Sequence, residues 1–146
     1  MKFKYQSSPS INPVTKERDL IYRPIIPIDI GYRDHWLSVV TDGAFRSLDA
    51  LIDTGSDNNL GPLQIASILD IPVDHYPKNK IWGITSDFTE CSFVPVAINI
   101  GGYVYNTVIG LGEKIIDLVL GSQGFLDHWQ VKLEYAKEIE LKFTKP

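Results

Sequence analysis

The segment Asp53-Thr54-Gly55-Ser56-Asp57 groups the side chains of this sequence that are best suited to chemistry. It follows the apolar residues Ala50-Leu51-Ile52, which predict a buried strand. Aspartate is depleted from strand interiors, so an acid at the end of a buried strand needs a reason. Gly55 permits a sharp turn and the close approach of a ligand, while the two hydroxyls can bind a carboxylate or a backbone group. These residues alone leave two interpretations open: an ordinary strand-ending turn, in which Asp, Gly and Ser are common, and a catalytic carboxylate.

The other residues with reactive side chains are isolated from one another. Cys91 is the single cysteine, so it cannot form a disulfide within the chain, and its apolar surroundings predict a packed structural thiol. The histidines, His35, His75 and His128, lie far apart without a second ligand at metal-binding spacing. We therefore expect no metal site and no cofactor.

Short apolar segments separated by turn residues predict the elements that would position Asp53. Ile26, Ile28 and Ile30 share one side of a strand at period two, although Pro24 and Pro27 favour a place at a sheet edge. Asp42-Gly43 is a strong hairpin-turn signal between segments 35–41 and 45–53.

The rest of the chain continues this pattern. A short helix is expected at 62–70, where leucine, isoleucine and alanine give a one-sided apolar face. The other expected elements are strands at 81–85, 91–100, 103–109 and 115–120, a second short helix at 121–129, and a closing hairpin of 131–135 with 138–143. Many short strands with one or two short helices predict an all-β sandwich or barrel.

Composition and charge exclude several classes of protein. The chain has 146 residues, 44% hydrophobic and 22% charged, which is typical of one globular domain. Its net charge is −4 and its basic residues are scattered, so nucleic acid is a poor partner. No apolar run approaches the roughly 18 residues of a membrane span, and no apolar segment follows the N-terminal lysines as in a signal peptide. The lone cysteine suits a reducing compartment, so we expect a cytoplasmic protein.

The first residues differ in character from the rest. Residues 1–19 carry Ser, Pro, Asn, Lys and Glu with no hydrophobic periodicity. We expect a flexible N-terminal arm there, followed by one domain over residues 20–146.

From Pro24 to Phe143 the sequence resembles the retropepsin-like aspartic proteases, the half-sized relatives of pepsin. The resemblance is carried by Leu51–Asp57 ahead of a short helix-like stretch, and by a glycine in a flap-like hairpin, Ile81–Thr85. Leu118-Val119-Leu120-Gly121, about 65 residues after Asp53, completes it. It implies a single-domain closed β-barrel or sandwich, half of a pepsin-type fold, that is dimeric.

The same resemblance implies an aspartic endopeptidase that hydrolyses extended peptides. Its chemistry needs two aspartates, whereas this chain has one Asp-Thr-Gly segment and no second acid in a matching context. A homodimer would therefore place Asp53 of each chain at the two-fold axis. Two carboxylates a few Å apart share one proton, so one acts as base on a water and the other polarises the scissile carbonyl.

Further roles follow from the resemblance, residue by residue. Thr54 would hold the two active-site loops together across the dimer, and Gly55 would offer its carbonyl to the peptide. The hydroxyl of Ser56 would bond the outer oxygen of the aspartate, and Asp57 would meet the substrate backbone. The remaining implied positions are the flap and substrate-binding residues Trp82, Gly83 and Ile84, and the supporting residues Ile52, Leu120 and Gly121.

A second hypothesis is a catalytically weak or silent domain of this type that serves as a dimerisation or peptide-binding module. Related proteins carry an acid or an arginine shortly after the second glycine, whereas here Gly121 is followed by Ser122-Gln123-Gly124. Gln123 can hydrogen-bond Asp57 but cannot neutralise it. A third possibility is an unrelated β-sandwich in which Asp-Thr-Gly is only a turn.

Overall fold

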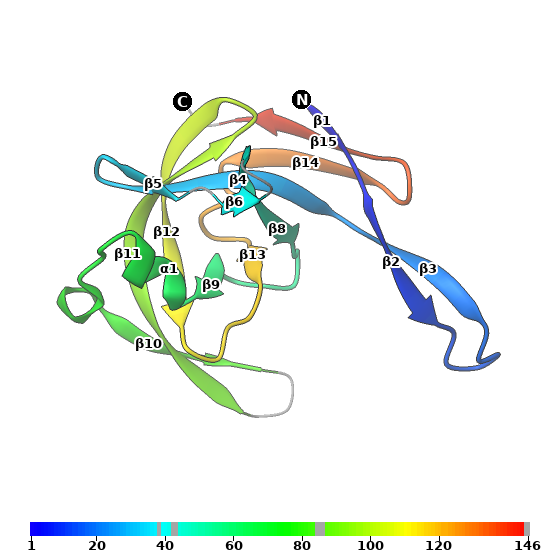
Figure 1. Cartoon of the computed structure of the whole chain (residues 1–146), viewed down its shortest axis with the longest axis horizontal. Coiled ribbons are helices and arrows are strands. Elements are labelled where there is room, and N and C mark those ends of the chain that lie inside the picture. The colour runs from blue at the N-terminus through cyan, green and yellow to red at the C-terminus, as the bar shows by residue number, and fades with distance from the viewer. Residues whose placement is uncertain (38, 42–43, 84–86, 145–146) are drawn as a thin grey trace.

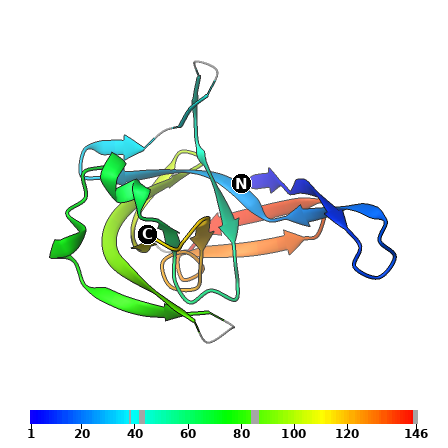
Figure 2. The ribbon, with the colours of Figure 1, turned by 60° about the horizontal axis from the view of Figure 1, so that its bottom comes forward.

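The computed structural model describes residues 1–37, 39–41, 44–83 and 87–144, and Figures 1 and 2 show how its strands are arranged. Eight strands form one sheet in the order β10-β11-β12-β9-β13-β8-β4-β5, and a further pairing of β11 with β4 closes six of them into a barrel. The strands of this sheet are β4 (Ile25–Tyr32), β5 (His35–Leu37), β8 (Leu48–Ile52), β9 (Leu60–Pro62), β10 (Lys78–Trp82), β11 (Phe88–Ile100), β12 (Tyr103–Gly112) and β13 (Leu118–Leu120).

Smaller sheets and two short helices complete the fold. One three-stranded sheet has the order β1-β15-β14, and two hairpins pair β2 with β3 and β6 with β7. Their bounds are β1 (Lys2–Lys4), β2 (Gln6–Ile11), β3 (Arg18–Arg23), β6 (Val39–Thr41), β7 (Ala44–Arg46), β14 (Trp129–Glu134) and β15 (Glu138–Phe143). The helices are α1 (Gln64–Ile68) and the 3₁₀ helix η1 (Val73–His75). No helix in these ranges has the length and apolar character needed to cross a membrane.

Alternation of side chains explains why these strands form the barrel. In β4 the three isoleucines at 26, 28 and 30 are fully buried, as their spacing predicts. In β11 the buried side chains also recur at every second position, from Val94 through Val96 and Ile98 to Ile100. The glycines Gly101 and Gly102, both at positive φ, then turn the chain into β12. The predicted all-β architecture is therefore confirmed.

Strand β4 does not lie at a sheet edge as its prolines predicted. It pairs with β8 through Ile25–Ile28 and with β11 through Asp29–Gly31. In the described residues, Pro27 therefore has a strand partner on one side only. The missing N–H of a proline is tolerated where one side of the strand is unpaired, which reconciles Pro27 with a central strand.

Expectations for the first residues and for residues 121–129 also differ from the structure. The segment 1–19, expected to be a flexible arm, contains β1, which pairs with β15, and β2, which pairs with β3. The expected domain boundary at residue 20 falls inside β3. The second predicted helix, 121–129, is a series of turns. Phe125 and Trp129 have the spacing of a helix face, but from these turns both side chains pack into the core.

The central turn expected at Asp42-Gly43 lies outside the described residues, but the strands on either side, β6 and β7, pair antiparallel. The expected closing hairpin is present as β14 and β15. It lies beside the start of the chain, where the amino group of Met1 donates to the carbonyl of Leu141 at 2.8 Å.

Candidate active site

Asp53 lies immediately after β8, at the point where two parallel strands end side by side. Ile52 is the register partner of Leu120 in β13, and both side chains are buried. The N–H of Asp53 donates to the carbonyl of Leu120 at 2.9 Å, so the aspartate is fixed to the end of the second strand. Its side chain is half-buried, and its Oδ1 accepts a hydrogen bond from the N–H of Gly55 at 2.9 Å. This bond holds one carboxylate oxygen in place.

The turn that carries Asp53 is joined to the loop that follows β13. The N–H of Ser122 donates to the carbonyl of Ser56 at 2.8 Å, and that of Gln123 donates to the carbonyl of Asp57 at 2.9 Å. Gly121 makes this contact possible, because a Cβ there would clash with the backbone of Asn58 and approach the Ser56 carbonyl at 2.7 Å. The two glycine-containing loops thus behave as one backbone-bonded unit.

Asn59 supports both loops, a role that its local sequence does not predict. Its side chain is fully buried, accepts from the N–H of Gly121 at 3.0 Å and donates to the carbonyl of Val108 at 3.2 Å. It therefore connects the two loops to β12. An Asn-Asn pair directly before a short apolar strand is the only signal in the sequence, and the partners of Asn59 lie 49 and 62 residues away.

The far end of the second loop is held by hydroxyl groups of β12. The carbonyl of Gly124 accepts from Thr107 Oγ1 at 2.7 Å and from the Tyr105 hydroxyl at 3.1 Å. Burial raises the pKa of Tyr105, so its phenol stays protonated and able to donate at ordinary pH. Gly124 itself has a φ of +101°, and a Cβ there would meet the Asn59 amide at 2.5 Å.

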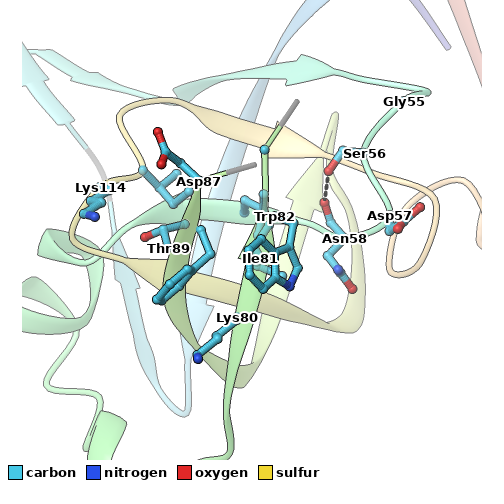
Figure 3. Close-up of a pocket in the computed structure, with 14 residues that line it drawn as sticks. Gly55, Ser56, Asp57, Asn58, Lys80, Ile81, Trp82, Asp87, Thr89 and Lys114 are labelled. Carbon is cyan, nitrogen blue, oxygen red and sulfur yellow. Dashed lines mark hydrogen bonds between the residues drawn. The ribbon is translucent and has the colours of Figure 1, made fainter. Parts of the chain in front are cut away.

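A pocket of about 620 Å³ opens between the Asp53 turn and the hairpin of β10 and β11. Figure 3 shows Gly55, Ser56 and Asp57 on one side, and Lys80, Ile81 and Trp82 from β10 on the other. The full lining is Gly55, Ser56, Asp57, Asn58, Leu60, Lys80, Ile81, Trp82, Gly83, Asp87, Phe88, Thr89, Lys114 and Ile115. Asp53 is not among these residues, so it lies beside the pocket rather than in its wall.

The hairpin side of the pocket is aromatic and exposed. Trp82 and Phe88 are register partners across β10 and β11, with ring centroids 5.3 Å apart. Trp82 is 63% exposed, which is unusual for so large an apolar side chain. Lys80 Nζ lies 4.5 Å from the centroid of the Phe88 ring, within range of a cation–π contact. This side can therefore cover a bound apolar group.

The predicted site residues occupy different places around this pocket. Thr54 and Asp57 are exposed, and Gly83 closes the hairpin turn by donating its N–H to the carbonyl of Asp87 at 2.8 Å. Ile84 lies outside the described residues. The Ser56 hydroxyl donates to the carbonyl of Asn58 at 2.8 Å and not to the aspartate as expected, because that carbonyl lies within its reach two residues further along the same turn (Figure 3).

Cys91 and the histidines show no site of their own. Cys91 is buried, and desolvation raises the pKa of its thiol, which disfavours a nucleophilic thiolate. Within the part of the chain that the structure describes, no group of three or more His, Cys, Asp or Glu side chains is placed to hold a metal ion.

Comparison with known proteins identifies the fold. No protein-family profile and no curated protein sequence matches the chain. A retropepsin-like aspartic protease from Rickettsia conorii superposes with a TM-score of 0.54 at 13% sequence identity, over 97% of this chain and 96% of that chain. The EIAV protease complexed with the inhibitor HBY-793 gives a TM-score of 0.49 at 21% identity, over 68% of this chain and 82% of that chain. The Rickettsia comparison confirms that the chain has a retropepsin-like fold.

Proposed function

We propose that this chain is an aspartic endopeptidase that acts as a homodimer. The observation that carries the proposal is the position of Asp53. Its carboxylate stands at the paired ends of β8 and β13, in a turn that borders a pocket covered by an aromatic hairpin. The retropepsin-like fold supports the same function. Each chain supplies one such aspartate, so the chemistry requires two chains.

Hydrolysis would proceed through a pair of aspartates that shares one proton. The ionised Asp53 takes a proton from water while the oxygen of that water attacks the scissile carbonyl carbon. The protonated Asp53 of the second chain hydrogen-bonds the carbonyl oxygen and stabilises the charge that develops on it. Proton transfer to the amide nitrogen then lets the carbon–nitrogen bond break. The N–H of Gly55 holds one carboxylate oxygen in place throughout.

The pocket walls would bind an extended peptide or protein substrate. On the turn side, the Gly55 carbonyl and Asp57 would bond the substrate backbone, and Thr54 would join the two turns across the dimer. On the hairpin side, Trp82, Gly83 and Ile84 would cover the peptide as a flap. The exposed face of Trp82 supports this role, since a bound side chain would remove it from water.

One observation favours the second candidate, a binding module with little or no activity. The loop after β13 meets Asp57 through the backbone N–H of Gln123, without a charged side chain at that position. A peptide could then bind in the pocket without productive alignment at Asp53.

The single cysteine supports a cytoplasmic location for either function.

A mixing experiment tests whether the catalytic pair spans two chains. The D53N variant is added in about nine-fold excess to the active chain, and peptide cleavage is followed after the subunits exchange. Random pairing leaves about one active chain in ten with an active partner, so activity falls about tenfold. Activity that is unchanged by the variant would contradict a shared pair. Binding of a statine-type peptide without any cleavage would favour the binding module.

A further inference from the structure

A cavity of about 340 Å³ lies apart from the pocket beside Asp53, because the two linings share no residue. Its walls come from the end of β4 and the turn after it, from the segment between η1 and β10, and from β11 and β12. Neither β10 nor the Asp53 turn contributes to it. The cavity is therefore a separate candidate for ligand binding.

Small residues in a row across the sheet form the floor of this cavity. Gly31 of β4 pairs with Trp36 of β5 and with Ala97 of β11, and Ala97 in turn pairs with Asn106 of β12. Directly paired residues point to the same face of a sheet, so the two small residues lie between two larger side chains. The indole ring lies over Gly31, where a Cβ would approach it to 2.9 Å. The floor next to this ring, at Pro95 and Ala97, is apolar and can carry the body of a small organic ligand.

Arg33 carries the one formal charge among the described residues that line this cavity. Its guanidinium carbon lies 5.3 Å from the centroid of the Tyr32 ring, and none of the ion pairs in the described part of the chain includes it. Four other cavities, including the one beside Asp53, each have at least one acid in their lining. In a chain of net charge −4, a cavity whose single charge is positive favours an anionic ligand.

A pair of phenols adds a hydrogen-bond donor to the same lining. The hydroxyls of Tyr32 and Tyr76 lie 2.6 Å apart, and their rings meet edge-on. One phenol proton occupies this hydrogen bond, so the other is free to be donated to a ligand. The hydrogen bond with Tyr32 also raises the pKa of Tyr76, which keeps its phenol protonated, although the positive charge of Arg33 acts in the opposite direction. A guanidinium and a phenol are both donors that suit an oxyanion.

The backbone at Arg33 has a conformation that arginine rarely adopts. Its φ is +54°, in the left-handed region that favours glycine or asparagine. Tyr32 and His35 are register partners, so the turn between β4 and β5 has two residues, and such turns need a positive φ. Glycine would serve this turn at a lower conformational cost. The turn therefore gives no reason for an arginine at this position, whereas an anionic ligand does.

We propose that this cavity binds a small organic anion, with its oxyanion group at Arg33 and its apolar body on the floor at Pro95 and Ala97. The group is a carboxylate or a phosphate, since both accept the forked hydrogen bonds of a guanidinium. The site does not depend on the proposed protease function, because its residues take no part in the pocket beside Asp53.

Three probes of similar size test the ligand chemistry: benzoate, phenyl phosphate and the neutral analogue benzamide. Each is titrated into the full chain while amide NMR chemical shifts are followed. We expect the anions, and not benzamide, to shift the signals of Gly31, Arg33 and Ala97 in a saturable way. The anion that binds more tightly identifies the group as a carboxylate or a phosphate. Equal binding of benzamide, or no saturable shift at these residues with either anion, would overturn the proposal.

The variant R33G tests the role of the arginine without harming the fold. Glycine suits the positive φ of the turn, so this variant should be at least as stable as the original chain. We expect it to weaken binding of the preferred anion at least about tenfold, because the charge-assisted hydrogen bonds are lost. R18Q, at an exposed arginine of β3, is the control and should bind the anion unchanged. An R33G chain that binds the anion as tightly as the original would overturn the proposal.

Discussion

The two sides of the pocket are built in opposite ways. The Asp53 turn is bonded by backbone groups to the loop after Gly121, and the buried side chain of Asn59 ties both to β12. The hairpin of β10 and β11 is held by strand pairing and presents Trp82 to solvent. One side therefore fixes the position of the carboxylate, while the other can adapt to what is bound.

A pair of glycine substitutions gives the largest expected contrast between the two sides. In G121A the new Cβ would meet the backbone carbonyls of Ser56 and Asn58, so we expect a loss of about 3 kcal/mol or more in unfolding free energy. In G83A, on the hairpin, the nearest atom of the described residues is the Asp87 carbonyl at 3.7 Å, an ordinary contact. That variant should lose less than about 1 kcal/mol. Urea denaturation measures both, and equal losses would contradict the contrast.

Substitution of the adjacent residues Asn58 and Asn59 tests the hydrogen bonds that hold the Asp53 turn in place. N59A leaves the N–H of Gly121 and the carbonyl of Val108 without their partner in a buried place. We expect it to destabilise the fold by about 2–4 kcal/mol and to lower kcat. Asn58 makes its hydrogen bond through its backbone carbonyl, so N58A should cost less than about 1 kcal/mol. If N59A left both the unfolding free energy and kcat unchanged, the hydrogen bonds of Asn59 would not support the turn.

Substitution of Trp82 has the smallest expected effect on stability. Because 63% of the side chain is exposed, W82A should change the unfolding free energy by less than about 1 kcal/mol. It removes apolar surface that would cover the substrate, so KM should rise about five- to tenfold with a smaller change in kcat. W36A, at a tryptophan outside the pocket lining, is the control. An unchanged KM in W82A would show that the hairpin does not contribute to substrate binding.

Local patterns were sufficient to predict the barrel strands other than β9, and together with the family resemblance they marked Asp53 as a candidate. The isoleucines at 26, 28 and 30 alternate because the strand has one buried face, and this needs no knowledge of the partner strands. The Asp-Thr-Gly segment is recognisable because an acid, a hydroxyl and a glycine follow an apolar strand directly. The pairing of Ile52 with Leu120 explains why the segments around Asp53 and Gly121, which are far apart in the sequence, lie side by side.

Local sequence patterns do not predict contacts between distant segments. Phe125 and Trp129 have helical spacing, but their carbonyl and amide groups close turns, and both rings pack in the core. The first residues lack periodicity, yet β1 forms because β15 offers it an edge. Asn59 was missed for the same reason, since its importance depends on Gly121 and Val108.

Cleavage of a diverse peptide library is the decisive test of the proposal that Asp53 is the catalytic acid and base. The folded chain and D53N are compared across pH values from about 3.5 to about 7.5, because the pair can act only while it shares a single proton. We expect cleavage that is strongest in acid and about a thousandfold weaker or absent in D53N. A folded, dimeric chain that cleaves nothing, or a D53N variant that cleaves as well as the original chain, would contradict the claim.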